Sequence, residues 1–405
     1  MSRWLALVSL VLVFWSVSVH GQEETKEDGF IHRDFQFTFM VPPVGTNGME
    51  FARVVNCFSI NTFAGFSAGT ECMEVGGFLN INKAYMRGSQ IAGFANIVGL
   101  VGGAGYPSEG IQVAGFGNYM NSSFDGAHIA GFTNINPRCT RGIQASGFAN
   151  IMNLSTGSLQ AAGFANITRK ADSTLQLAGF INIFARGRNN SQASGFVNVG
   201  EDIRGVQMAG FTNIARNVSG VQMAGFINIA DSIQGIPLGF INIVNKNGYS
   251  GFEISSSDFN YFQLTYKLGT PWFYNIYSAG KPMGSINRWT MGLGLGTSIP
   301  FDPNYTLKLE AIVHQELHIG EDRAPSWMHT DRLNMVNQIR AIFSRKILRQ
   351  ISVFLAPTFN IGIASDKGAG NPIGEDLMPY WKITPIDGTR DRVRLWFGFS
   401  GGVSL

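Results

Sequence analysis

A Gly-Phe-x-Asn motif recurs eleven times in the middle of this 405-residue chain and constrains its fold more than any other feature. Successive repeat phenylalanines lie 14 to 16 residues apart, except for one gap of 22 that carries the insertion Gly99–Pro107. The fullest copy, Gly205–Ile214, reads Gly-Val-Gln-Met-Ala-Gly-Phe-Thr-Asn-Ile. A unit this short cannot bury its own apolar face, so the copies must stack on one another. The repeat therefore predicts a β-solenoid of 15–16-residue coils, with a stack of β-hairpins as the alternative.

Alternate side chains of an extended segment share a face, so we expect Gln207, Ala209, Phe211 and Asn213 on the same face. Equivalent residues then stack from coil to coil, Phe on Phe and Asn hydrogen-bonded to Asn as a ladder. A buried amide without such partners costs about 1–3 kcal/mol. Glycine before the phenylalanine allows a bend or a close approach. The expected repeat core is Phe78, Asn80, Phe94, Asn96, Phe116, Asn118, Phe132, Asn134, Phe148, Asn150, Phe164, Asn166, Phe180, Asn182, Phe196, Asn198, Phe211, Asn213, Phe226, Asn228, Phe240 and Asn242. The handedness of the coil, and which face lies inside, stay open.

After residue 251 the apolar period changes to two, which is typical of half-buried strands. Phe262 and Leu264, for example, alternate with Gln263 and Thr265. Segments of this length and pattern are typical of membrane β-barrels, with apolar residues toward lipid and polar residues toward the interior. Seven strands are predicted near 257–268, 271–279, 287–299, 304–318, 332–346, 350–364 and 392–405. A further strand at 33–41 would complete an eight-stranded closed barrel.

The topology follows from this strand count. The connections alternate between short and long, and in outer-membrane barrels the long ones face outward. With 33–41 as the first strand, everything from 42 to 256 becomes one extracellular loop, which places the solenoid on the cell surface. Val54–Phe66 offers a ninth strand instead of the first coil. A ten-stranded barrel would turn the solenoid toward the periplasm.

The ends of the chain and its cysteines indicate the compartment. Residues 1–21 are expected to be a secretory signal peptide, because a short apolar run follows Arg3. The domains are then 22–48 with the first barrel strand, 49–250 as solenoid and 251–405 as the remaining barrel. Export implies an oxidising compartment. Cys57 and Cys72 bridge adjacent coils in one interpretation, and all three cysteines, Cys139 included, are small buried residues in the other.

Composition and spacing exclude several kinds of chemistry. A net charge of +3 is too small for electrostatic capture of nucleic acid, and only 14% of residues are charged. His314 and His318 share a strand face about 13 Å apart at 3.3 Å per residue, too far to bind one metal ion. Charged residues expected inside the barrel form either an ion path or, as we favour, ion pairs that fill the interior: Lys308, Glu310, His314, Glu316, Arg340 and Arg394. No catalytic, cofactor-binding or metal-binding residues are predicted.

Three motifs carry a resemblance to a known family. They are Pro42–Gly48, the repeated Gly-Val-Gln-x-Ala-Gly-Phe-x-Asn-Ile, and Phe273–Ile276. With them the chain resembles the surface-repeat outer-membrane proteins of Bacteroidota and some spirochaetes over nearly its whole mature length. The resemblance implies an exported barrel with a displayed repeat. It carries no enzymatic activity over to this chain, so no catalytic residues are transferred.

The expected function is therefore that of a non-enzymatic outer-membrane protein. Its solenoid would serve binding, adhesion or structural interaction with surface proteins or glycans, in contact with outer-membrane lipid. The semi-apolar variable positions of the repeat, such as Met208 and Met223, support a contact surface. An accessory subunit of a larger outer-membrane complex is the alternative. A small membrane-embedded enzyme is a third possibility.

Overall fold

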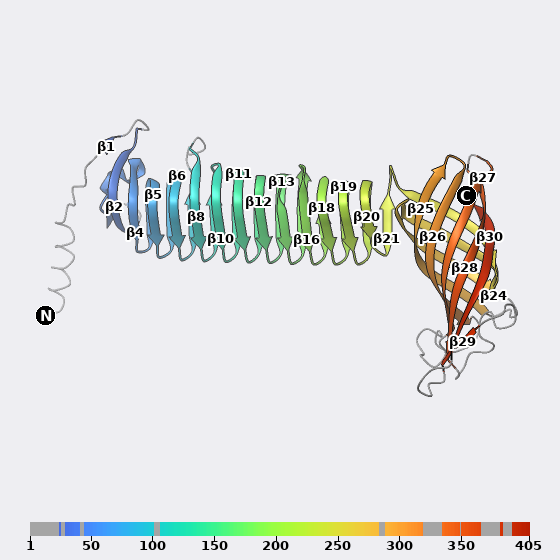
Figure 1. The fold of residues 1–405 in the computed structure, drawn as a ribbon. Coiled ribbons are helices and arrows are strands. Elements are labelled where there is room, and N and C mark those ends of the chain that lie inside the picture. The colour runs from blue at the N-terminus through green and yellow to red at the C-terminus, as the bar shows by residue number, and fades with distance from the viewer. Residues whose placement is uncertain are drawn as a thin grey trace. The chain divides into compact units, whose positions relative to one another are not determined.

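The computed structural model describes residues 24–25, 29–40, 44–100, 106–282, 288–318, 334–348, 350–365, 381–383 and 391–405. Almost all of them belong to β-strands, and the chain forms two compact units, 1–210 and 211–405. The first unit consists of solenoid coils, and the second holds the last coils and a closed barrel (Figure 1). The predicted all-β fold of a solenoid and a small barrel is confirmed. Among the described residues, no helix is long and apolar enough to cross a membrane.

The first unit contains eighteen strands and one 3-10 helix among its described residues. Their bounds are β1 (Glu24–Thr25), β2 (Ile31–Met40), β3 (Val44–Gly45), η1 (Gly48–Arg53), β4 (Val54–Asn61), β5 (Ala64–Gly76), β6 (Leu79–Ala92), β7 (Ala95–Val98), β8 (Ser108–Ala114), β9 (Gly117–Met120), β10 (Phe124–Ala130), β11 (Thr133–Ser146), β12 (Ala149–Ala162), β13 (Ala165–Asp172), β14 (Leu175–Ala178), β15 (Ile181–Arg186), β16 (Asn190–Ser194), β17 (Val197–Val199) and β18 (Asp202–Ala209).

Successive coils pair in parallel, with equivalent repeat residues side by side. Asn134 is opposite Asn150, and Asn150 is opposite Asn166. The close stacking explains the glycine of the motif: a Cβ atom on Gly147 would lie 2.1 Å from the carbonyl oxygen of Gly131 in the neighbouring coil. The sequence expectation of a close approach before the phenylalanine is confirmed for the copies from Phe94 to Phe211.

The N-terminal strand β2 belongs to the solenoid, so its assignment as the first barrel strand is wrong. It pairs in parallel with β4, from Ile31 opposite Val54 to Thr38 opposite Asn61. The alternation of exposed phenylalanines in β2 suits either a barrel wall or the outer face of a coil, because both have a period of two. Its inward side chains decide the matter: the side-chain carbonyl of buried Gln36 accepts hydrogen bonds from Asn47 and Asn56. The solenoid is therefore not inserted after the first barrel strand but precedes the whole barrel.

The second unit continues the repeat and then forms the barrel. Its coil strands are β19 (Thr212–Ala224), β20 (Ile227–Leu238) and β21 (Ile241–Val244). Its barrel strands are β22 (Tyr249–Ser257), β23 (Asn260–Thr270), β24 (Phe273–Pro282), β25 (Arg288–Asp302), β26 (Tyr305–His318), β27 (Asn334–Lys346), β28 (Ser352–Ser365) and β30 (Asp391–Ser404), with the short β29 (Trp381–Ile383) beside β30.

The barrel closes with eight antiparallel strands, since β22 pairs with β23 on one side and with β30 on the other. All seven strands predicted after residue 251 are present. The eighth is β22, which the sequence analysis missed because Ser255–Ser257 breaks the apolar alternation. The ten-stranded alternative is excluded within the described part of the chain. The alternative use of Val54–Phe66 as a barrel strand is excluded too, because β4 and β5 pair inside the solenoid.

The two ends of the barrel differ in their connections. Short turns join β23 to β24, β25 to β26, and β27 to β28. The C-terminal Leu405 exchanges backbone hydrogen bonds with Phe252 near the start of β22, so the chain enters the barrel from the solenoid at this short-turn end. The expected long loops near 279–286, 319–331 and 365–391 lie largely outside the described residues, as does the expected signal peptide. The first-loop argument for surface display loses its basis, because the solenoid is no barrel loop.

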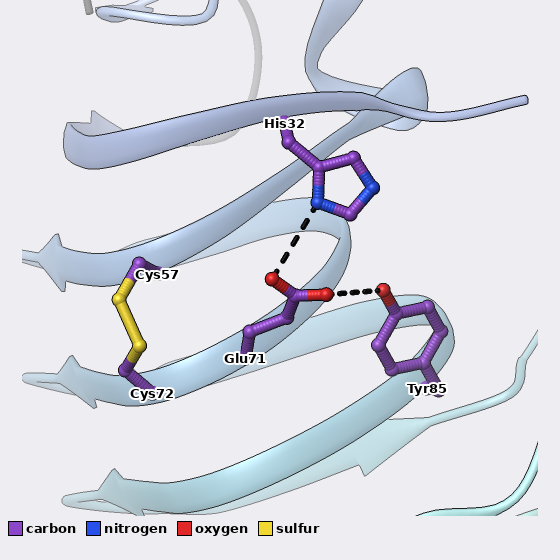
Figure 2. Close-up of a disulfide and its surroundings, with 5 residues drawn as sticks. All are labelled: His32, Cys57, Glu71, Cys72 and Tyr85. Atoms are coloured by element: carbon purple, nitrogen blue, oxygen red, sulfur yellow. Dashed lines mark hydrogen bonds and ion pairs between the residues drawn. A yellow bond between two sulfur atoms is a disulfide. The ribbon is translucent and has the colours of Figure 1, made fainter. Parts of the chain in front are cut away.

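A disulfide joins Cys57 on β4 to Cys72 on β5, with Cα atoms 4.6 Å apart (Figure 2). Of the two interpretations of the cysteines, bridging of adjacent coils is the one the structure has, while Cys139 is free. Beside the disulfide, the Glu71 carboxylate lies 3.5 Å from Nδ1 of His32 and accepts a hydrogen bond from the Tyr85 hydroxyl at 3.2 Å (Figure 2).

Replacing both Cys57 and Cys72 by serine is expected to lower the free energy of unfolding by about 3 kcal/mol. The bridge closes a loop with a sequence separation of 15 residues, and the entropy of the unfolded chain rises by about that amount when such a loop opens. Urea titration of the purified protein, followed by circular dichroism, measures the change. Cys139→Ser is the matched control, and an equal loss in that variant would contradict the prediction.

Candidate functional site

Within each of the two units, the asparagines of the repeat form a buried ladder inside the coils. The Nδ2 of Asn150 donates to Oδ1 of Asn166 at 2.8 Å and to the carbonyl oxygen of Ala161 at 2.8 Å, while its own Oδ1 accepts from Asn134 at 2.9 Å. The eleven ladder asparagines, from Asn80 to Asn242, are each at most 2% exposed. The predicted ladder is confirmed within each unit, where it fixes the register of successive coils.

A second ladder consists of glutamines, and it is broken at two neighbouring coils. Gln112 donates to Gln90 at 2.6 Å and Gln176 donates to Gln160 at 2.7 Å. Between them, His128 occupies the glutamine position, stacked on Phe124 with ring centroids 3.9 Å apart. Neither ring nitrogen of His128 has a hydrogen-bond partner among the described residues, and the amide of neighbouring Gln144 has none either.

Replacing His128 by glutamine is expected to raise the free energy of unfolding by about 1 kcal/mol at neutral pH, because it restores the amide ladder. Burial lowers the pKa of His128 to about 3, from an ordinary value of 6.5. Below pH 6.5, His128 binds a proton in the unfolded chain but stays neutral in the folded chain. The free energy of unfolding therefore falls as the pH drops from 6.5 toward 3. Thermal melts across this range should show a weaker acid dependence in His128→Gln, and parallel pH curves for both proteins would refute the assignment.

Glu74 is a buried group that the sequence analysis missed. It stands at the glutamine position of the first copy and accepts hydrogen bonds from Asn61 at 2.8 Å, Thr70 at 2.9 Å and Gln90 at 2.9 Å. Burial raises the pKa of its carboxyl, and these hydrogen bonds oppose the shift. Its position four residues before Phe78 is the signal that would have identified it.

The repeat phenylalanines lie on the outside of the coils, so their expected placement on one face with Gln and Asn is wrong. Phe148 is 42% exposed, whereas Asn150 is fully buried. The Gly-Phe pair forms the turn between two strands, and the alternation of side chains is broken there. The predicted stacking is confirmed: Phe148 and Phe164 are parallel, with ring centroids 5.0 Å apart.

Aliphatic side chains flank the phenylalanines on the outer faces of the coils. They include Ile129, Ile143, Ile151, Ile167, Leu175 and Met208, each about two-fifths exposed or more. Where this row narrows to Ala145 and Ala161, an open groove of about 630 Å³ runs beside the turns. We call the Gly-Phe turns and these flanking aliphatic residues the apolar edge.

The charged residues of the coils gather at the opposite turn, which we call the charged edge. In the ten copies from Phe94 to Phe240, the eleven residues from six before to four after the phenylalanine contain no Asp, Glu, Lys or Arg. The charges form exposed pairs, such as Arg141 with Asp125 at 3.4 Å and Lys170 with Asp172 at 3.3 Å. Exposed pairs of this kind contribute about 0–1 kcal/mol each, so they mark a hydrated surface more than a stabilising one.

The interior of the barrel holds a compact ion network. Lys267 lies 2.5 Å from both Glu253 and Glu310, and Arg340 lies 2.8 and 2.7 Å from the same two carboxylates. The Tyr274 hydroxyl donates to Glu310 at 2.7 Å. The residues predicted to point inward are all buried, as expected: Lys308, Glu310, His314, Glu316, Arg340 and Arg394. The network fits the expectation of mutually paired charges filling the interior.

Within the second unit, the last coil packs on the outer wall of the barrel. Asn242 donates to Oδ1 of Asn275 on β24 at 2.7 Å, so the asparagine ladder continues onto the barrel. The Tyr277 hydroxyl donates to the carbonyl oxygen of Phe240, and the two rings meet edge to face at 5.7 Å. Tyr274 and Ile276, which alternate with these two residues along β24, are fully buried, so Asn275 and Tyr277 lie on the outer face.

The contact lies halfway along the barrel strands. Phe240 shares a groove of about 460 Å³ with outward residues of four further strands, Leu293, Val313, Ile339 and Phe359. Val313 and Ile339 stand near the middle of β26 and β27. Sequence reasoning missed this contact. The last copy differs from the others in its 14-residue spacing and in Pro237 at the glutamine position, but neither feature indicates a contact with the barrel.

The described residues contain no cluster of three or more His, Cys, Asp or Glu side chains that could hold a metal ion. The sequence-predicted asparagines thus form a structural ladder and the phenylalanines form an outer ridge. Of the predicted interior charges, Glu310, Glu316 and Arg340 form ion pairs. Compared with protein-family models, with curated proteins and with solved structures, the chain matches none.

Proposed function

We propose that this chain is a non-enzymatic integral outer-membrane protein, whose barrel anchors the solenoid as a scaffold for other envelope components. The observation that carries the proposal is the polarity of the barrel. Leu355 and Ile339 on its outer wall are 60% and 59% exposed, while Glu310 and Arg340 inside are almost completely buried. An outer wall of this kind is unfavourable in water and suits lipid, where closure also leaves no strand edge unpaired.

The position of the link to the solenoid supports a periplasmic side for the scaffold. The solenoid joins β22 at the short-turn end of the barrel, and short turns face the periplasm in barrels of this class. This observation favours an accessory or structural role beside other outer-membrane proteins over adhesion outside the cell. Extracellular display stays a prediction of the sequence and has no topological argument behind it.

A protease site inserted after Gly157 tests the proposal in cells. This glycine lies in a charged-edge turn at φ 57°, and no atom lies near its Cβ position. We expect cleavage only after the outer membrane is permeabilised, together with recovery of the chain in the outer-membrane fraction. A second site within 366–380, between β28 and β30, is the control and should be cut on intact cells.

Two outcomes would contradict the proposal. Cleavage after Gly157 on intact cells would move the solenoid to the cell surface and remove the periplasmic scaffold. Recovery of the chain in the soluble fraction would overturn the membrane anchor itself.

A further inference from the structure

The solenoid has an inverted distribution of polarity. Its interior holds ladders of Asn and Gln side chains, and its outer surface carries Phe, Ile, Leu and Met. A protein that folds in water normally places these two classes the other way round. The stacked rings form an apolar ridge with centroid spacings between 4.7 and 5.1 Å from Phe63 to Phe196.

In all ten copies from Phe94 to Phe240, the charged residues lie away from the phenylalanine ridge. Every Asp, Glu, Lys and Arg between residues 88 and 244 lies on the charged edge. A local binding patch would require uncharged residues in only a few copies, whereas here the apolar edge is uncharged in all ten. Segregation of charge to one edge over the whole length is the pattern of elements that lie at a membrane interface.

The backbone amides at the Gly-Phe turns of the apolar edge are hydrogen-bonded within the protein, as contact with hydrocarbon requires. At the Gly-Phe turn, the amide of Gly147 donates to Ala130 at 3.2 Å, and the amides of Phe148 and Ala149 both donate to the carbonyl oxygen of Phe132. The neighbouring coil therefore satisfies all three amides of this turn. In hydrocarbon each unsatisfied amide would cost several kcal/mol, so this pairing is a requirement for contact with acyl chains.

The second unit shows the level at which this edge meets the barrel. Phe240, the last ring of the edge, rests on Tyr277 and borders a groove with Val313 and Ile339 at the middle of the outer wall. If the barrel spans a bilayer, this part of the wall lies among acyl chains. The apolar edge is therefore continuous with the lipid-facing surface of the barrel at Phe240.

We propose that the apolar edge of the solenoid is embedded in the acyl chains of the membrane that holds the barrel, with the charged edge at the level of the headgroups and water. The occupant of the edge and of its groove at Ala145 and Ala161 is thus lipid hydrocarbon. The inference rests on the proposed membrane anchor and adds a role for the repeat. The repeat then supplies a lipid-contacting surface in addition to the outer wall of the barrel.

Three single-cysteine variants test this in the full-length protein, in a Cys139→Ser background that keeps the Cys57–Cys72 disulfide. Ile151→Cys reports on the apolar edge, Arg141→Cys on the charged edge and Leu355→Cys on the outer wall of the barrel. All three side chains are exposed, so the substitutions leave the ladders intact. Each variant is labelled with an environment-sensitive fluorophore and reconstituted into phosphatidylethanolamine–phosphatidylglycerol vesicles with brominated or ordinary acyl chains.

We expect the label at Ile151 to be quenched by brominated chains and to respond roughly fivefold less to aqueous iodide than the label at Arg141. An apolar face about 5–10 Å below the headgroups is out of reach of a hydrated anion. Equal iodide quenching at both sites would overturn the inference, and so would shielding from iodide without quenching by bromine, which would point to a protein partner. Bromine quenching at Leu355 but not at Ile151 would refute only the immersed edge. Its absence at Leu355 would refute the membrane anchor and with it the inference.

Discussion

Replacement of Arg340 by methionine is expected to lower the free energy of unfolding of the barrel by about 3–5 kcal/mol. Arg340 and Lys267 share the carboxylates of Glu253 and Glu310, all of them at most 2% exposed. Without the guanidinium, two buried carboxylates face one ammonium, and a buried charge without its partner costs about this amount. Urea titration in lipid vesicles, with barrel folding read from heat-modifiable gel mobility, measures the loss.

Lys346→Met is the matched control for this experiment. Lys346 ends the same strand, β27, and its side chain is exposed. Its removal should change the unfolding free energy by less than about 1 kcal/mol. If Arg340→Met were as stable as this control, the interior network would not hold the barrel together.

Replacement of Asn150 by leucine is expected to destabilise the solenoid by about 4 kcal/mol. The change removes one of the acceptors of Asn134, which keeps the carbonyl oxygen of Ala145. It also leaves Oδ1 of Asn166 without its donor and the carbonyl of Ala161 without its side-chain partner. Each buried polar group that loses its partner costs about 1–3 kcal/mol. Circular dichroism during urea unfolding of the full-length protein measures the effect.

Asn153→Ala provides the comparison on the same strand. Asn153 accepts a hydrogen bond only at an exposed pair with Arg169, so its loss should cost well under 1 kcal/mol. Similar losses in the two variants would mean that the ladder contributes nothing specific. If Asn150→Leu unfolds the solenoid while the barrel keeps its heat-modifiable gel mobility, the effect is local. Such a result would agree with a solenoid whose stability is the sum of contributions from individual coils.

The repeat was sufficient to predict the solenoid because its period fixes which residues are neighbours. Asn150 can meet Asn134 and Asn166 only if coils of 16 residues stack in register, and the structure has that register. The barrel strands after residue 257 were predictable for a related reason, since their alternation extends over ten or more residues. In both cases a local pattern is repeated often enough to specify a long-range pairing.

Two features were not predictable from the same patterns. The strand at 31–40 alternates like a barrel strand, and only its pairing with β4 shows that it belongs to a coil. The outward position of Phe148 follows from a turn at Gly147, where a strict two-residue period no longer applies. Alternation gives two faces but not their neighbours, so it cannot distinguish lipid from a polar interior or one sheet from another.

The in-register stacking of equivalent residues has an evolutionary consequence. Deletion of one copy, such as 149–164, would bring Ala165 into the place of Ala149 and leave Asn134 facing Asn166, so every ladder would close again. Duplication of a copy would be equally neutral in register. Unequal recombination between near-identical gene segments can therefore change the length of this protein in whole steps, without passing through an unfolded intermediate sequence. The number of copies, and with it the length of the solenoid, can then change by selection without any change in the barrel.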